Sequence, residues 1–246
     1  MSNTSIAFLI TIISGLVTLL GILPIFINFK NTNKIIASSL SFASAVMLTI
    51  SITDLIPESI KMLRASLKEI YIPLLILIAV FTGILISNIL RKELINNKDS
   101  LYKVGLISMI TIIIHNIPEG IVTFITTTNN TSIGLSLAIA IAIHNIPEGL
   151  SIGVPIYYST KKRSIAFYYT LLASLSEPLG ALLSYLFIQK IINKLLLGLL
   201  LSLISGLMIS ISLTELLPSS LSYKETRITQ ISFIIGIIII LIKLLI

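Results

Sequence analysis

Eight long, mainly apolar stretches follow one another along the chain, with short polar segments between them. A helix needs about 20 apolar residues to cross the hydrocarbon core of a bilayer. In lipid the backbone N–H and C=O groups must be bonded within the protein, which favours helices for stretches of this length. The sequence therefore predicts an all-α polytopic membrane protein, a single transmembrane domain over 1–246, with helices at approximately 6–29, 35–59, 70–90, 104–127, 132–158, 164–188, 195–218 and 228–246.

The composition agrees, since 55% of the residues are hydrophobic, only 11% are charged and the mean hydropathy is +1.06. A soluble domain carries about 25% charged residues. These values exclude a soluble globular protein, a disordered chain and a nucleic-acid-binding domain. The chain has no cysteine, which excludes disulfides, thiolate ligands and Cys nucleophiles. The first ten residues lack a basic segment and a cleavage site, so we interpret them as the start of the first helix.

The basic residues predict the orientation of the helices in the membrane. Of 17 Lys and Arg residues, 11 fall on one side, in the segments 30–34, 91–103, 161–163 and 224–227, and 6 on the other. Loops on the cytoplasmic side carry the excess of Lys and Arg. The net charge of +7 is therefore a membrane-loop bias, and both termini are predicted outside the cytoplasm, in a cell (plasma or inner) membrane.

Six of the ten acidic residues lie within the apolar stretches, where a charge is costly. They are Asp54, Glu58, Glu119, Glu148, Glu177 and Glu215. An ionised acid at a helix centre costs about 2.5–3.5 kcal/mol on insertion scales. Apart from Lys243 the stretches contain no Lys or Arg, so we expect these acids to lack a basic partner and to need a bound cation or a proton. An acid near a helix end, such as Glu58 or Glu215, could equally be protonated and donate a hydrogen bond to a backbone carbonyl.

A six-residue motif, His115-Asn116-Ile117-Pro118-Glu119-Gly120, recurs without change 29 residues later as His144-Asn145-Ile146-Pro147-Glu148-Gly149. The two histidines of these motifs are the only ones in the chain. Residues four apart share one face of a helix, so His and Glu of each motif point the same way. Each proline removes a backbone donor and is expected to kink its helix.

The helices that carry the two motifs are predicted to be antiparallel across a short loop at 128–131. His115 is then expected at the level of Glu148, and Glu119 at the level of His144. Neutral imidazole with carboxylate suits zinc and other first-row divalent ions. The alternative is a pair of polar helix contacts packed around proline kinks.

A third carboxylate, Glu177, precedes Pro178 near the centre of the sixth stretch. Three carboxylates and two histidines in one layer can hold two metals with a bridging Glu. Storage of a proton on Glu177 is the alternative.

A second repeat relates the second and seventh stretches. Residues 47–57 (MLTISITDLIP) resemble residues 208–218 (MISISLTELLP), 161 positions later. The predicted helices run in opposite directions, which indicates an inverted repeat, with helices 1–3 mirrored by 6–8 around helices 4–5, as in many transporters. Asp54 lies about 10 Å from Met47 toward the outside. We interpret Asp54 as an outer attraction point and Glu215 as an inner one. A core role for Met47 and a packing role for the neighbouring Ser and Thr residues are the alternatives.

The paired motifs, the stretch Ser176-Glu177-Pro178-Leu179-Gly180-Ala181 and the eight-helix plan resemble the ZIP (Zrt/Irt-like) family of metal transporters over essentially the whole chain. The minimal loops resemble bacterial members. The resemblance implies one metal site from His115, Glu119, His144 and Glu148, and a second from Asn116, Asn145 and Glu177 with Glu119 and Glu148 bridging. Met47 matches a position that faces the site in some members. Many members carry a His-rich loop between helices 3 and 4, whereas segment 91–103 has no His.

We therefore expect transport of Zn²⁺, or of Fe²⁺, Mn²⁺, Co²⁺ or Cd²⁺, into the cytoplasm through a midplane two-metal site, with no catalytic residue, no separate cofactor and no nucleic-acid partner. The bilayer is the other partner, and Gly- and Ser-rich helix faces are compatible with a homodimer. One rival is a membrane-embedded metal-dependent hydrolase, although no His-Glu-x-x-His motif is present. Another is a metal receptor, although no loop is long enough for a soluble output domain.

Overall fold

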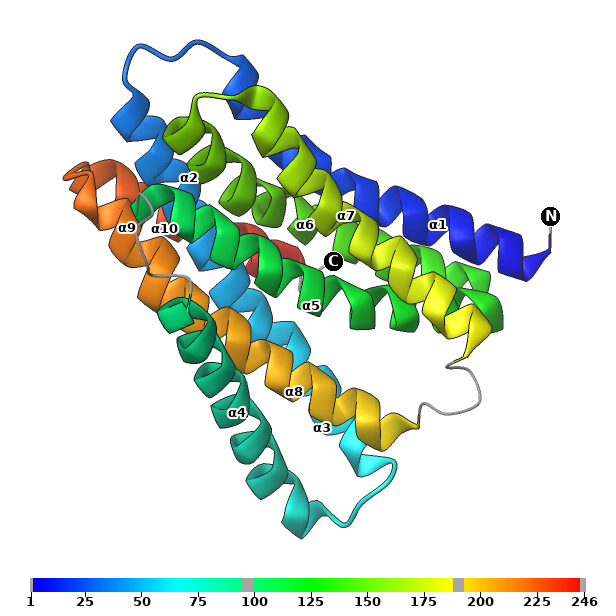
Figure 1. The fold of residues 1–246 in the computed structure, drawn as a ribbon. Helices are drawn as coiled ribbons and strands as arrows, with labels where there is room; N and C mark the ends of the chain where they lie inside the picture. Colours follow the sequence, from blue (N-terminus) through cyan, green and yellow to red (C-terminus); the bar gives the residue numbers. More distant parts are fainter. Residues whose placement is uncertain (1, 94–99, 188–192, 244–246) are drawn as a thin grey trace. The chain divides into compact units, whose positions relative to one another are not determined.

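The computed structural model describes residues 2–93, 100–187 and 193–243, and their regular structure is entirely helical. Residues 188 and 244–246 of the predicted helices, and 94–99 of the third loop, lie outside the described residues. The described part contains eight helical stretches (Figure 1): α1 (Asn3–Val17) with η1 (Thr18–Phe26); α2 (Thr32–Ile50), η2 (Ser51–Leu55) and α3 (Ile56–Arg64); η3 (Glu69–Tyr71) and α4 (Ile72–Glu93); α5 (Ser100–Asn129); α6 (Thr131–Thr160); α7 (Arg163–Leu186); α8 (Lys194–Ile211), η5 (Ser212–Leu216) and α9 (Leu217–Ser222); and α10 (Thr226–Lys243).

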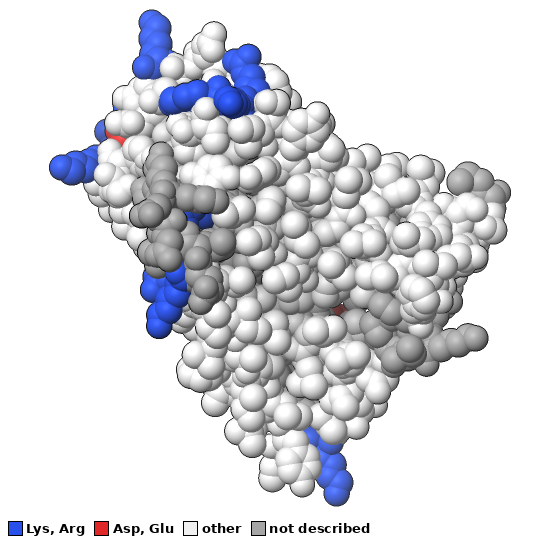
Figure 2. Space-filling model, in the orientation of Figure 1, with Lys and Arg blue, Asp and Glu red and all other residues white. Residues whose placement is uncertain are grey.

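Six of these stretches are long and apolar enough to cross a membrane. The two outside that set are α7, which carries Glu177 and several Ser and Thr residues, and α10, whose apolar part is shorter. On the face shown in Figure 2, the Lys and Arg side chains lie mostly toward the margins of the view, and the area between them is nearly free of charged side chains. The predicted all-α polytopic fold is confirmed.

The chain divides into two compact units, each built from two separate segments. Unit 1 comprises residues 1–29 and 108–191, and unit 2 comprises residues 30–107 and 192–246. Unit 1 thus contains α1, η1, α6, α7 and the larger part of α5. Unit 2 contains α2 to α4 and α8 to α10.

Unit 2 displays the inverted repeat in its contacts. The Ser59 hydroxyl donates to the carbonyl of Gly198 at 2.7 Å, and the Ser220 hydroxyl donates to the carbonyl of Ala37 at 2.7 Å. Ser220 and Gly198 lie 161 positions after Ser59 and Ala37, so the two bonds are repeat equivalents. Ala37 and Ser59 follow each other along α2–η2–α3, and their partners Ser220 and Gly198 occur in the reverse order along α8–η5–α9. The two stretches are therefore antiparallel. In the same way α4 packs along α8 and α10 packs along α2.

Each of these two long stretches contains one π-helical turn, at equivalent positions. The turn η2 carries Asp54 and the turn η5 carries Glu215, and each is followed by a proline two residues later. A π-turn places one extra residue in a helical turn and is frequently found at functional sites. At Pro118, Pro147 and Pro178, where the sequence led us to expect kinks, the helices α5, α6 and α7 continue without an irregular turn.

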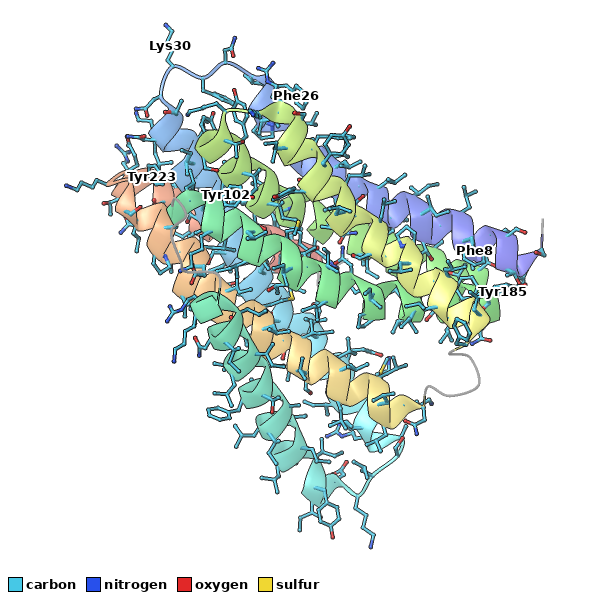
Figure 3. The ribbon with its side chains drawn as sticks, in the orientation of Figure 1. Phe8, Phe26, Lys30, Tyr102, Tyr185 and Tyr223 are labelled. Atoms are coloured by element: carbon cyan, nitrogen blue, oxygen red, sulfur yellow. The ribbon has the colours of Figure 1, made fainter. Side chains whose placement is uncertain are left out.

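Unit 1 is arranged around a tight hairpin between α5 and α6. Asn130 alone separates the two helices, and its side chain accepts hydrogen bonds from the N–H groups of Ser132 and Ile133, both at 3.1 Å. An Asn cap of this kind satisfies the free donors of a helix start. At the hairpin end of the unit, Phe8 of α1 packs against Tyr185 of α7, with ring centroids 5.6 Å apart (Figure 3), and both rings lie against Phe124 of α5. The hairpin fixes the register of the two motif-bearing helices.

Candidate metal centre

The two histidines and two glutamates of the repeated motif meet between α5 and α6. Nε2 of His115 lies 3.1 Å from Oε1 of Glu119 on the same helix and 3.5 Å from Oε1 of Glu148 on the other. Nε2 of His144 lies 3.0 Å from the same Oε1 of Glu119. All four side chains are buried. The cross-helix pairs are those expected from an antiparallel hairpin.

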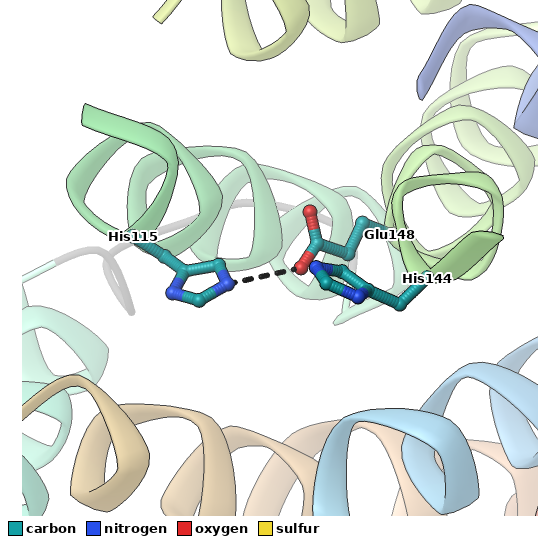
Figure 4. A group of neighbouring side chains, drawn as sticks. All are labelled: His115, His144 and Glu148. Carbon is teal, nitrogen blue, oxygen red and sulfur yellow. Dashed lines mark ion pairs between the residues drawn. The ribbon is translucent and has the colours of Figure 1, made fainter. Parts of the chain in front are cut away.

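The arrangement contains a set of ligand atoms for one divalent ion. One ligand atom each from His115, His144 and Glu148 lie within 4.8 Å of one another, and among the described residues this is the group of His and acidic side chains that could hold an ion (Figure 4). Zinc bonds to nitrogen and oxygen at about 2.0–2.2 Å, which puts tetrahedral ligand atoms about 3.4 Å apart. An ion would therefore draw these groups together by about 1 Å, a shift that side-chain torsions can supply.

A metal ion can bind an imidazole nitrogen only if that nitrogen carries no hydrogen. The Glu119 carboxylate is an acceptor only, so an Nε2 that donates to it carries a hydrogen and offers no lone pair to a metal. Nε2 of His144 makes this hydrogen bond to Glu119, whereas Nε2 of His115 and Nδ1 of both rings are buried without a hydrogen-bond partner among the described residues. An ion bound at Nε2 thus requires the hydrogen to leave or to move to Nδ1. Ion binding and proton release are coupled in such a site.

Asn145 and Glu177 extend the centre toward α7 and α1. The Asn145 Nδ2 donates to Oε2 of Glu177 at 2.9 Å and to the backbone carbonyl of Ser14 at 3.0 Å. Glu177 is fully buried, and α7 approaches α5 closely because Gly120 has no side chain where the Glu177 carbonyl lies. A carboxylate from a third helix is therefore held by an amide of the motif.

Asn116, the counterpart of Asn145 on α5, is also buried, and its amide has two orientations. In one, Nδ2 donates to the carbonyl of Ala173 at 3.4 Å. In the other, which the surrounding donors and acceptors favour, the amide nitrogen donates to Oε2 of Glu148 at 3.3 Å and to the carbonyl of Ile112 at 3.2 Å. Either orientation leaves the amide beside the centre.

Several oxygens of the centre are buried without a hydrogen-bond donor among the described residues. They are Oε2 of Glu119, Oε1 of Glu148, Oε1 of Glu177 and Oδ1 of Asn145. A buried polar atom without a partner costs about 1–3 kcal/mol. The ion pairs that Glu119 and Glu148 make within the described chain are with histidine. Oxygens that accept nothing from the protein, with no Lys or Arg paired to them, suit a cation.

The remaining candidates, Met47, Asp54 and Glu215, all belong to unit 2. Met47 is fully buried in α2, and Asp54 in η2 accepts a hydrogen bond from the Thr53 hydroxyl at 3.0 Å. Glu215 is buried at a cavity of about 230 Å³ that Lys103 and Thr214 also line.

One expectation was wrong for two of the six acids, because Glu58 and Glu215 have basic partners. Nζ of Lys61 lies 3.3 Å from Oε2 of Glu58 at the surface. Nε of Arg91 lies 3.7 Å from Oε1 of Glu215. The sequence places Arg91 just past the third apolar stretch. Its side chain reaches Glu215 because α4 lies along α8, and long basic side chains commonly extend along apolar surface in this way. Sequence analysis also missed Ser14, which acts through its backbone carbonyl and so leaves no side-chain signal.

Comparisons with known proteins agree with one family. A sequence model described as ZIP Zinc transporter matches residues 92–243. A zinc transporter named ZupT from Oceanobacillus iheyensis is 37% identical over 100% of this chain and 99% of its own length. The ZupT zinc transporters of Streptococcus mutans and Chlorobium luteolum are each 36% identical; the first match covers 97% of this chain and 96% of the relative, the second 100% and 99%.

Proposed function

This chain belongs to the ZIP zinc transporter family, and we propose that it moves Zn²⁺, or a related divalent transition-metal cation, into the cytoplasm through the centre between α5, α6 and α7. As a member of a transporter family and a multi-pass membrane protein, it is not an enzyme, which removes the hydrolase alternative. The observation that carries the proposal is the buried group of His115, His144 and Glu148, with Glu119 in contact with both rings.

We propose two cation positions in this centre. The first uses the imidazoles of His115 and His144 with the carboxylates of Glu119 and Glu148. The second uses Asn116, Asn145 and Glu177, with Glu119 and Glu148 as bridging ligands. The orphan oxygens of Glu119, Glu148, Glu177 and Asn145 support the second position, because all are acceptors without a donor in the described chain.

Entry and exit are assigned to the two π-turns of unit 2. Asp54 attracts the hydrated cation on the outside, and Glu215 receives it on the inside, where Arg91 lies beside it. Met47 lines the path from α2. This assignment includes a cell membrane location with both termini outside, and it rests on the excess of basic residues in the inner loops.

Zinc uptake into proteoliposomes tests the proposal. We expect His115→Ala and Glu148→Ala to abolish uptake, because each removes a ligand of the first position. Glu58→Ala is the matched control: its side chain is 44% exposed and pairs with Lys61 at the surface, an interaction of little energy. Uptake by the two centre variants at the rate of Glu58→Ala would contradict the proposal. Competition with Fe²⁺, Mn²⁺, Co²⁺ and Cd²⁺ in the same assay defines which cations are carried.

A further inference from the structure

Unit 1 contains a residue-by-residue symmetry, of which the sequence displays the α5–α6 half as the repeated motif and the structure adds the half that relates α1 and η1 to α7. Gly120 of α5 packs on the backbone of Glu177, and Gly149 of α6 packs on the backbone of Thr18 in η1. At each glycine a Cβ atom would collide with the facing carbonyl oxygen. Gly149 lies 29 positions after Gly120, and Glu177 lies 159 positions after Thr18.

The same two offsets relate a second pair of close approaches and a pair of hydrogen bonds. Gly180 packs on the carbonyl of Ile117, and Gly21 packs on the carbonyl of Ile146. The symmetry therefore exchanges α5 with α6 and α7 with α1 and η1.

The amides of the two motifs follow this symmetry. Asn145 donates to the carbonyl of Ser14 at 3.0 Å, and Asn116, in the orientation that faces α7, reaches the carbonyl of Ala173 at 3.4 Å. Ser14 and Ala173 are again 159 positions apart. Two independent pairs of glycine contacts thus give the same correspondence, the positions of the two amides agree with it, and in it Thr18 takes the place of Glu177.

The hydroxyl of Thr18 is a buried polar group without a partner in the described chain. The hydroxyls of Thr111 and Thr123 are likewise without a partner there. Several other buried threonines donate to the carbonyl four residues earlier, as Thr11 and Thr170 each do at 2.9 Å. For Thr18 that carbonyl belongs to Ser14, which accepts the amide of Asn145 instead. The hydroxyl of Thr18 is left for another partner.

We propose that Thr18 is a specificity-determining residue of the metal centre, the uncharged counterpart of Glu177 on the flank of Asn116. This inference rests on the proposed function of that centre. Glu177 gives one flank a carboxylate, and Thr18 gives the opposite flank only a neutral hydroxyl. The centre therefore holds its second cation on the side of Glu177 and Asn145. A carboxylate at position 18 supplies the matching ligand on the side of Asn116.

Thr18→Asp and Thr18→Asn test this directly, because Asp and Asn have nearly the same shape as each other, are close to Thr in volume, and differ in charge. Each full-length variant is purified in detergent and titrated with ZnCl₂ by calorimetry, and bound zinc per chain is measured by elemental analysis. We expect Thr18→Asp to bind one more zinc per chain than Thr18→Asn. Equal numbers and equal affinities in the two variants would overturn the inference.

An exchange of charge across the symmetry covers the case in which Thr18→Asp alone does not fold. Glu177→Asn is expected to lose one zinc per chain, and Glu177→Asn combined with Thr18→Asp to regain it, with the charge of the centre restored. Failure of the folded double variant to regain it would overturn the inference. A parent protein that binds no zinc would instead refute the proposed function, so the two failures are distinguishable.

Transport kinetics give a readout that a purely structural role would not produce. An added negative charge should raise the affinity of the centre for the cation and slow the release of the cation. We expect Thr18→Asp to lower both KM and kcat for zinc uptake relative to Thr18→Asn. A fall in kcat with unchanged KM would assign Thr18 to packing alone and contradict the inference.

Discussion

Replacement of Glu119 by Gln removes one charge from the residue that contacts both imidazoles, and its effect can be worked out from the structure. Oε1 of Glu119 lies 3.1 Å from His115 and 3.0 Å from His144. Hydrogen bonds to charged groups contribute about 1.5–3 kcal/mol and neutral ones about 0.5–1.5 kcal/mol. Of the two contacts, only that of His144 has hydrogen-bond geometry, so the zinc-free variant is expected to be less stable by about 1 kcal/mol.

The larger effect is expected on stabilisation by zinc. At a free zinc concentration of 100 times Kd, binding stabilises the parent by about 2.7 kcal/mol. Loss of a group next to a metal lowers affinity by about 10–100-fold even when that group is not a direct ligand. A 100-fold loss at the same zinc concentration leaves about 0.4 kcal/mol of stabilisation.

Thermal unfolding with and without zinc measures this difference. With about 2–4 °C per kcal/mol for a chain of this size, zinc should raise the Tm of the parent by about 5–11 °C and that of Glu119→Gln by about 1 °C. Glu58→Gln, at an exposed acid, is the control and should respond to zinc as the parent does. If zinc raises the Tm of Glu119→Gln as much as that of the parent, Glu119 is no part of the cation site.

Three further predictions concern protons, packing and orientation. Zinc uptake should fall when the outside pH is lowered from 7.5 to 5.5, because carboxylates and imidazoles must lose protons to bind the cation; uptake that is constant over this range would count against the site. Gly120→Ala should lower stability by about 1–3 kcal/mol in thermal unfolding, since its Cβ meets the backbone of Glu177, which cannot rotate away; an unchanged Tm would refute the close packing. Because the chain has no cysteine, Ser66→Cys should react with an impermeant maleimide on intact cells and Asn33→Cys only after permeabilisation; the reverse pattern would invert the proposed orientation.

The sequence predicted much of the centre because its information is local. Each motif places His and Glu one turn apart on a helix, and the short connection at Asn130 makes the two helices antiparallel neighbours. Those two facts suffice to bring His115 toward Glu148 and Glu119 toward His144. The inverted repeat could also be predicted, because the sequences of residues 47–57 and 208–218 resemble each other directly.

Other features depend on packing between distant segments and could not be read in this way. The pair of Arg91 and Glu215 forms because α4 lies along α8, and neither residue signals the other in sequence. The correspondence of Thr18 and Glu177 pairs unlike residue types, so only the contacts of Gly120 and Gly149 expose it. The π-helical turns η2 and η5 were not predicted from the sequence either.

Zinc X-ray absorption spectroscopy of the purified protein, loaded with one equivalent of zinc, tests the central claim most directly. The site predicts imidazole nitrogen and carboxylate oxygen ligands at about 2.0–2.2 Å. Two imidazoles per zinc are expected in the parent, from His115 and His144, and one in His115→Ala. A parent spectrum without imidazole, or one that His115→Ala leaves unchanged, would contradict a metal centre at the repeated motif.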